Sequence, residues 1–152
     1  ETGRYVVGKS GIYVAKVLDK KVSHGKTFVI LKNTLNGFIR PSLSQLVASY
    51  AGDRPLFASE PLFPGPNAFE MIALSNSAET ETVTLVGNLC TATDVVAKDV
   101  ELPKMQPGDV VVMTNAGSYA AVLSPMQFSS QEAPAQLLLT GDGKVVPANT
   151  AR

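Results

Sequence analysis

The chain has 152 residues, of which 45% are hydrophobic and 17% charged, as in a compact domain with a sizeable core. Thirteen basic and thirteen acidic side chains balance, so nothing favours binding to nucleic acid or to an anionic membrane. No apolar run approaches the ~20 residues of a membrane span, and no secretory signal opens the chain. With one cysteine and one histidine, we expect no internal disulfide, no bound metal and a cytoplasmic location.

Runs of β-branched and aromatic residues, bounded by turn residues, predict most of the secondary structure. Residues 13–22 are compatible with a strand, and Val7 to Lys16 with a short helix. Pro41 favours a helix that runs from there to about Tyr50, because proline suits the first turn of a helix. The other predicted strands lie at 27–32, 69–75, 80–89 and 109–114, with a hairpin at 136–146.

The remaining segments have the composition of turns and irregular structure. Residues 51–68 contain four prolines and two glycines, and residues 115–124 are rich in small side chains. Residues 94–107 show a mixed pattern that ends in a Pro-Gly-Asp turn. We therefore predict a single, mainly β domain over 1–152: an antiparallel or mixed β-barrel or sandwich with one or two short helices.

Cys90 is the only cysteine, and it lies four residues before Asp94. A thiol acts as an acid or a nucleophile only where its exposure and its neighbours tune its pKa. A lone cysteine is more often a small buried hydrophobic residue. From this stretch alone, both interpretations stay open.

Two other side chains are candidates for ligand binding. Arg40 precedes Pro41, which favours an extended backbone there, and its guanidinium could clamp a carboxylate or a phosphate. A surface ion pair is the simpler alternative for Arg40. Tyr119 follows small residues that would let a ligand approach closely, although a tyrosine half-buried at a sheet edge is more common.

Five stretches, taken in order, resemble the C-terminal portion of the fold-type III pyridoxal-phosphate decarboxylases, the diaminopimelate and ornithine decarboxylase family. They are ETGRY, FIRPSL, LCTATDVVAKDVELP, PGDVVVMTNAGSYA and PAQLLL. The family counterparts are EPGR, a Phe/Ile-Arg-Pro stretch, a CESGD-like stretch with KDxxLP, PGD with DAGAY, and a strand that opens with Pro-Ala. The resemblance implies a β-domain like that of alanine racemase, detached from an N-terminal (β/α)8 barrel, with residues 1–15 as a remnant of the connection.

The resemblance also implies how the chain would contact pyridoxal 5'-phosphate. Glu1 would pair with the pyridine nitrogen of the cofactor, while Gly3 and Arg4 would contact its phosphate. Tyr119 would pack beside the cofactor. The lysine that forms the Schiff base would lie outside this chain, on the barrel, so the isolated chain is predicted to be inactive.

On the substrate side, the resemblance gives Arg40 the role of holding a substrate carboxylate and makes Asp94 the last acid of the substrate-binding motif. Cys90 would reach into the active site of a partner subunit and donate a proton there. The expected partners are thus the barrel of the same protein, a second subunit in a homodimer and a small amino-acid substrate.

Several positions depart from the family pattern. Thr2 replaces a proline, Thr91 the glutamate of CESGD, Ser44 a tyrosine, and Phe128-Ser129 a tyrosine-asparagine pair. Because three changes fall on the substrate side, we expect a substrate other than meso-diaminopimelate, with a conjugated amino acid of a siderophore or antibiotic pathway as a candidate. The alternatives are a β-barrel binding module without catalysis and a domain of an amino-acid racemase.

Overall fold

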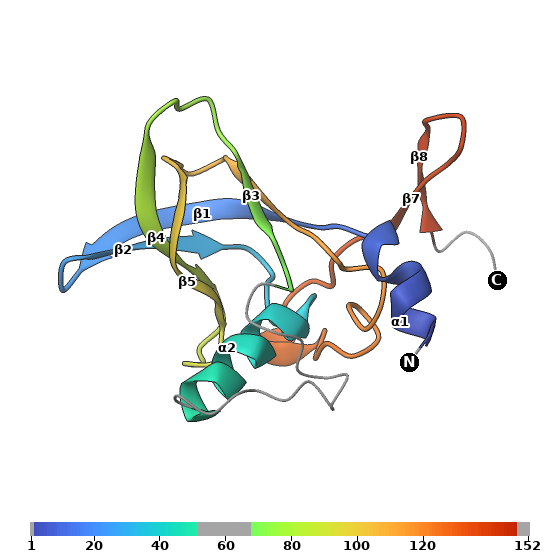
Figure 1. The fold of residues 1–152 in the computed structure, drawn as a ribbon, viewed down its shortest axis with the longest axis horizontal. Helices are drawn as coiled ribbons and strands as arrows, with labels where there is room; N and C mark the ends of the chain where they lie inside the picture. The colour runs from blue at the N-terminus through green and yellow to red at the C-terminus, as the bar shows by residue number, and fades with distance from the viewer. Residues whose placement is uncertain (1, 52–67, 149–152) are drawn as a thin grey trace.

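The computed structural model describes residues 2–51 and 68–148, and in it the chain is built around one curved, six-stranded sheet (Figure 1). The strand order is β3-β6-β1-β2-β4-β5, and every neighbouring pair is antiparallel except β2 and β4. The strands are β1 (Tyr13–Ser23), β2 (Lys26–Leu31), β3 (Met71–Leu74), β4 (Thr80–Gly87), β5 (Val95–Pro103) and β6 (Val110–Met113).

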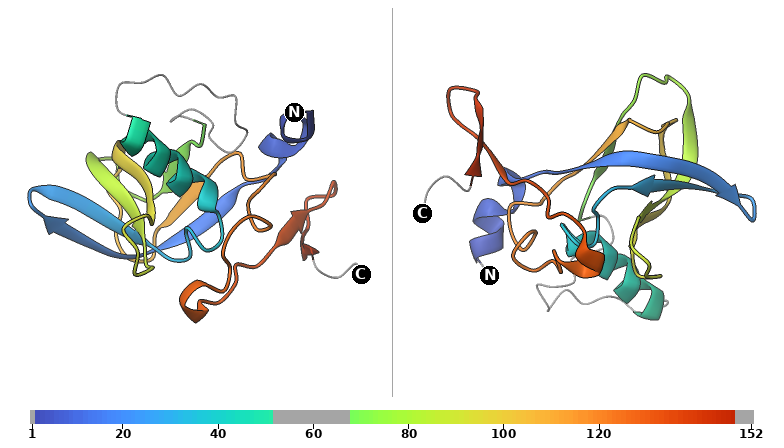
Figure 2. Two further views of the ribbon diagram at one scale, coloured as in Figure 1. Left: turned by 90° about the horizontal axis from the view of Figure 1, so that it is seen from below. Right: turned by 180° about the vertical axis from the view of Figure 1, so that it is seen from behind.

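The sheet is nearly closed, because its edge strands β3 and β5 approach each other. The segments that follow these strands are joined by two hydrogen bonds, from Ser75 Oγ to Lys104 O (2.6 Å) and from Lys104 N to Glu79 O (2.8 Å). Helix α2 (Ile39–Ala51) packs against β5 on the concave side of the sheet (Figure 2). This arrangement confirms the predicted mainly β, mixed barrel-like fold with two short α-helices.

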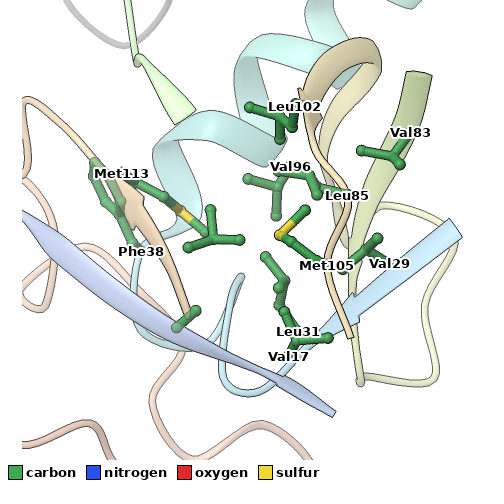
Figure 3. Close-up of a cluster of buried hydrophobic side chains, with 13 residues drawn as sticks. Val17, Val29, Leu31, Phe38, Val83, Leu85, Val96, Leu102, Met105 and Met113 are labelled. Atoms are coloured by element: carbon green, nitrogen blue, oxygen red, sulfur yellow. The ribbon is translucent and has the colours of Figure 1, made fainter. Parts of the chain in front are cut away.

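The core lies between the sheet and α2, where the inward-facing residues of the strands meet (Figure 3). Phe38 comes from the loop before α2 and packs edge-on against Phe69, with 5.3 Å between the ring centroids. Alternation along β1 and β6 buries one face of these strands, as the period of two requires, whereas β4 and β5 bury consecutive residues as well. The most buried core side chains from the strands are Val17, Val29, Leu31, Val83, Leu85, Val111 and Met113.

A second region extends beyond the sheet and carries exposed apolar side chains. It contains α1 (Thr2–Val7), followed by the 3-10 turn η1 (Gly8–Ser10), and the separate hairpin of β7 (Leu137–Leu139) and β8 (Val145–Pro147). Both views in Figure 2 place α1 and the hairpin at the same end of the molecule. We call this region the apolar end, and define it by Tyr5, Val6, Leu137, Leu138, Leu139 and Val145, which are each more than half exposed.

Most of the predicted elements are confirmed, including the hairpin turn at His24 and Gly25, whose φ angles of 50° and 75° are typical of a type I′ turn. The prediction of a helix from Val7 to Lys16 is wrong, since α1 ends at Val7 and β1 begins at Tyr13. Strand β5 was not predicted. Charged residues interrupt its apolar pattern, and Asp99 has a φ of 50°, so the strand is irregular.

The expected extended backbone at Arg40 is also wrong, because α2 begins one residue earlier, at Ile39. Pro41 lies in the first turn, where its missing N–H has no intrahelical partner to lose. The irregular loop predicted at 51–68 lies almost wholly outside the described residues. Among the residues that are described, no helix is both long and apolar enough to cross a membrane.

Candidate functional site

Three of the side chains predicted to contact the cofactor or the substrate, those of Arg4, Arg40 and Tyr119, lie together. The guanidinium carbon of Arg4, from α1, lies 5.5 Å from the centroid of the Tyr119 ring, and that of Arg40, from α2, lies 5.7 Å from it. A cation over an aromatic face stabilises by about 0.5–2 kcal/mol, depending on desolvation. Arg40 is only 2% exposed, so the surface ion pair considered for it is wrong. Three distant segments thus form one cationic cluster around a phenol.

Glycines bring α1 and η1 against the loop that carries Tyr119. Two backbone hydrogen bonds join the segments, from Ala116 N to Gly11 O (2.9 Å) and from Gly117 N to Gly8 O (3.0 Å). A Cβ atom on Gly117 would overlap the carbonyl oxygen of Val7. The small residues before Tyr119 therefore permit the close approach of another part of the chain, which brings Arg4 to the ring.

The segment after Tyr119 also fixes the start of α2. Ser124 Oγ accepts a hydrogen bond from Ile39 N (2.9 Å) and donates one to Ala120 O (2.7 Å). The first N–H groups of a helix have no intrahelical acceptor, so a side-chain oxygen from elsewhere can cap them. Ser124 thereby ties the first turn of α2, and with it Arg40, to the chain that follows Tyr119.

Cys90 is exposed, so the alternative of a small buried hydrophobic residue is wrong. Its sulfur lies 3.6 Å from Ser129 Oγ, within hydrogen-bonding distance for a thiol. Ser129 and Ser130 both have positive φ angles, 53° and 54°, a backbone conformation that residues other than glycine and asparagine rarely adopt. Cys90 and Ser129 thus form a second group of polar side chains, one from the loop after β4 and one from η2 (Phe128–Ser130).

Asp94 is 3% exposed, and its carboxylate accepts hydrogen bonds from within the domain. One oxygen accepts from Thr34 Oγ1 and from Leu35 N (3.2 Å), and the other accepts from Leu89 N (3.2 Å). Sequence reasoning missed Thr34 and Gly87 in this arrangement. A Cβ on Gly87 would overlap both Thr34 Oγ1 and the Asp94 carboxylate.

Tyr13 lies near the hydrogen-bonded carboxylate of Asp94, and its hydroxyl donates to Asn33 O. Burial raises the pKa of the Tyr13 phenol well above its usual value, and the charge of Asp94 raises it further. The phenol therefore stays protonated and remains a donor over the ordinary pH range. Asn33, with a φ of 52°, is of the residue type that tolerates this backbone conformation.

Of the two other predicted cofactor contacts, Gly3 lies within the described residues. Gly3 lies in α1, and no atom comes within 4 Å of the position of an added Cβ, so the space beside it is open. Glu1 lies outside the described residues. Among the described residues there is no group of three or more side chains that could hold a metal ion. Guanidinium and phenol groups are hydrogen-bond donors of the kind that bind a phosphate or carboxylate group.

Comparison with known proteins places this chain in a family. Residues 4–117 match the family described as "Pyridoxal-dependent decarboxylase, C-terminal sheet domain". L-glutamyl-[BtrI acyl-carrier protein] decarboxylase of Niallia circulans is 33% identical over 91% of this chain and 29% of its own length. 2-[(L-alanin-3-ylcarbamoyl)methyl]-2-hydroxybutanedioate decarboxylase of Staphylococcus aureus is 34% identical over 92% of this chain and 32% of its own length.

Solved structures agree in fold. Diaminopimelate decarboxylase of M. jannaschii, in complex with L-lysine, superposes with a TM-score of 0.75 at 23% identity, over 95% of this chain and 28% of that one. The chain spans less than a third of the length of these relatives. The chain belongs to the family of pyridoxal-dependent decarboxylases, and it forms the C-terminal sheet domain of that family.

Proposed function

We propose that this chain is part of an enzyme that removes CO2 from an amino acid with the help of pyridoxal 5'-phosphate. The observation that carries the proposal is the meeting of Arg4, Arg40 and Tyr119, because three separate family motifs supply one anion-binding cluster. When bound, the cofactor supplies the electron sink for decarboxylation. The chain supplies groups that bind, orient and protonate.

The residues of the cluster bind two different anionic groups, the cofactor phosphate and a substrate carboxylate. Arg4 and Tyr119 hold the cofactor phosphate, and the backbone at Gly3 approaches it through the open space beside α1. Arg40 holds a carboxylate of the substrate, and its burial strengthens that interaction by excluding water. Glu1 pairs with the ring nitrogen, a role that rests on the family motif alone.

Cys90 donates a proton from Sγ to the carbon that has lost CO2. Its exposure supports this role, since a buried thiol could not reach a substrate bound by another part of the protein. The thiol acts on the active site of a second subunit, so the enzyme works as a homodimer. A free thiol in this role also agrees with the predicted reducing cytoplasm.

The apolar end docks against the rest of the protein. Leu137, Leu138 and Leu139 are 61%, 54% and 69% exposed, and consecutive strand residues point to opposite faces, so both faces of the hairpin are apolar. Such surfaces mark interaction sites in folded proteins. The relatives are more than three times as long as the matched region, and the N-terminal barrel is the partner we propose.

We further propose a substrate larger than a free diamino acid. Thr91, Ser44 and Ser129 carry smaller side chains than the family motif residues, which leaves room on the substrate side. The names of the relatives from Niallia circulans and Staphylococcus aureus describe decarboxylation of amino acids joined to a carrier protein or to a hydroxy acid. A conjugated amino acid is therefore the substrate class to test first.

The test is made on the full-length protein. We expect a visible absorption band of lysine-bound cofactor that borohydride abolishes, and CO2 release from a conjugated amino acid that Cys90→Ala lowers by about 100-fold. The isolated chain, which lacks the proposed barrel lysine, should show neither. Absence of the band after addition of the cofactor would contradict the proposal and favour a binding module.

A further inference from the structure

Asp94 is a buried carboxylate to which the proposed reaction gives no task. We propose that it is a positioning residue, which holds the loop of Cys90 against the start of the helix that carries Arg40. This inference rests on the function proposed above for those two side chains. It replaces the expectation that Asp94 contacts the substrate, because the carboxylate oxygens already accept hydrogen bonds from the two loops.

The first of these loops carries the thiol. The second carboxylate oxygen of Asp94 accepts from Leu89 N at 3.2 Å, and Leu89 directly precedes Cys90. The main chain of Asp94 closes the same loop, because its carbonyl accepts from Gly87 N (2.9 Å) and its N–H donates to Thr91 O (3.2 Å). One residue therefore restrains the loop on both sides of the cysteine.

The second loop leads into α2. The first oxygen of Asp94 accepts from Thr34 Oγ1 and from Leu35 N. The carbonyl of Thr34 in turn accepts from the N–H groups of Gly37 (3.0 Å) and Phe38 (2.7 Å), the residues immediately before the helix. Since Arg40 is the second residue of α2, only this short turn separates it from the carboxylate.

The sheet topology places the two loops side by side. β2 and β4 are the parallel pair, and their register runs to Leu31 and Gly87, so both strands end at the same edge of the sheet. A further hydrogen bond joins Asn33 N to Asn88 Oδ1 (3.2 Å). The lack of a side chain at Gly87 lets Thr34 and Asp94 meet there. The fold thus brings the two loops together, and the buried Asp94 carboxylate bonds to both of them.

A carboxylate suits this position better than an amide. An ionised aspartate accepts at both oxygens, whereas asparagine offers one accepting oxygen and one donating nitrogen. In Asp94→Asn, the amide nitrogen would face either the donors of residues 34 and 35 or the N–H of Leu89. Either orientation places an amide N–H against a backbone N–H, of Leu35 or of Leu89, and so weakens the link between the two loops while preserving size and shape.

The experiment measures steady-state kinetics and amide hydrogen exchange on the full-length enzyme with Asp94→Asn. We expect kcat to fall by about 10- to 100-fold, because a small displacement of an acid costs that much, with KM changed less than about threefold. Hydrogen exchange should rise in both loops, 33–38 and 87–93.

Two further variants keep the test informative if Asp94→Asn folds poorly. Thr34→Val removes one donor and should change kcat and exchange in the same direction, by a smaller factor. Thr84→Val is the matched control, since Thr84 is also a buried threonine, 6% exposed, but contacts Asp99 N rather than either loop. It should leave kcat and exchange in both loops unchanged.

A rise in KM with unchanged kcat would mean that Asp94 contacts the substrate and would overturn the inference. Increased exchange confined to one loop, or unchanged exchange in both, would also overturn it. If the unmodified enzyme bound no cofactor and released no CO2, the proposed function would fail. The exchange measurement would still decide whether Asp94 couples the two loops.

Discussion

The barrel-like sheet and the apolar end are both rich in β-forming apolar residues, but only the sheet buries them within this chain. Leu85 in β4 is 0% exposed, whereas Leu138 in β7 is 54% exposed. Their local sequences, TLVG and LLLT, predict strands equally well. The comparison teaches that strand propensity sets the local conformation, while the availability of a partner surface sets burial.

The largest expected effect tests this difference directly. In the isolated chain, Leu85→Ala should lower the free energy of unfolding by about 2–5 kcal/mol, because it leaves a cavity in the core. Leu138→Ala should change it by less than about 0.5 kcal/mol. Urea denaturation measures both, and in the full-length protein Leu138→Ala should become clearly destabilising. An equal, small effect of Leu138→Ala in both forms would mean that nothing covers the hairpin.

Gly117 lies in the loop after β6, where this loop contacts α1 and η1. Gly117→Ala should lower the free energy of unfolding by about 1–3 kcal/mol, because its Cβ would overlap Val7 O. It should also weaken cofactor binding, since Arg4 depends on this contact to reach Tyr119. Gly141→Ala, with open space around it, is the control. Denaturation and cofactor titration of the full-length protein measure the two effects, and the prediction fails if the variants behave alike.

Tyr13 packs against the core and lies near Asp94, and it makes the free energy of unfolding depend on pH. Its pKa is raised above the unfolded value of about 10 by burial and by Asp94. Above that pH the unfolded phenol loses its proton while the folded one keeps it. The folded state therefore loses up to about 1.4 kcal/mol for each pH unit in this range. Below pH 10 this contribution is constant.

Tyr13→Phe should remove that dependence. The variant should be less stable by about 1 kcal/mol below pH 10, because the hydrogen bond to Asn33 O is lost. The difference from the unmodified protein should shrink as pH rises above 10. Urea denaturation from pH 8 to 11 measures it, and a constant difference would contradict a raised pKa.

The smallest expected effect concerns the exposed thiol. Ser129→Ala should change the rate at which iodoacetamide alkylates Cys90 by about two- to fourfold, because the hydroxyl that contacts the sulfur is removed. Ser130→Ala is a matched control, with almost the same φ angle one residue later. Mass spectrometry of the peptide that contains Cys90 measures the rate. Equal rates in the two variants would show that the contact has no influence on the thiol.

Much of the fold could be predicted from the sequence. The turn at His24-Gly25, the strand at 27–32 and the helix around Pro41 depend on residues that are close in the chain, so local chemistry specifies them. β5 escaped prediction because Lys98, Asp99 and Glu101 break the alternation. Pairing with β4 outweighs this irregularity, as Val83↔Val100 and Leu85↔Ala97 are partners in the register.

The sequence by itself determined the family and the identity of the candidate residues, because its motifs stand in order along the chain. It also determined that two arginines and a tyrosine stand in the family motifs. Only the tertiary structure decided that Arg4 and Arg40 share the ring of Tyr119. Only the parallel pairing of β2 with β4 decided that Asp94 would be enclosed by two loops. Local patterns are set by neighbours in sequence, whereas burial and hydrogen-bond partners are set by segments that the fold brings together from far apart.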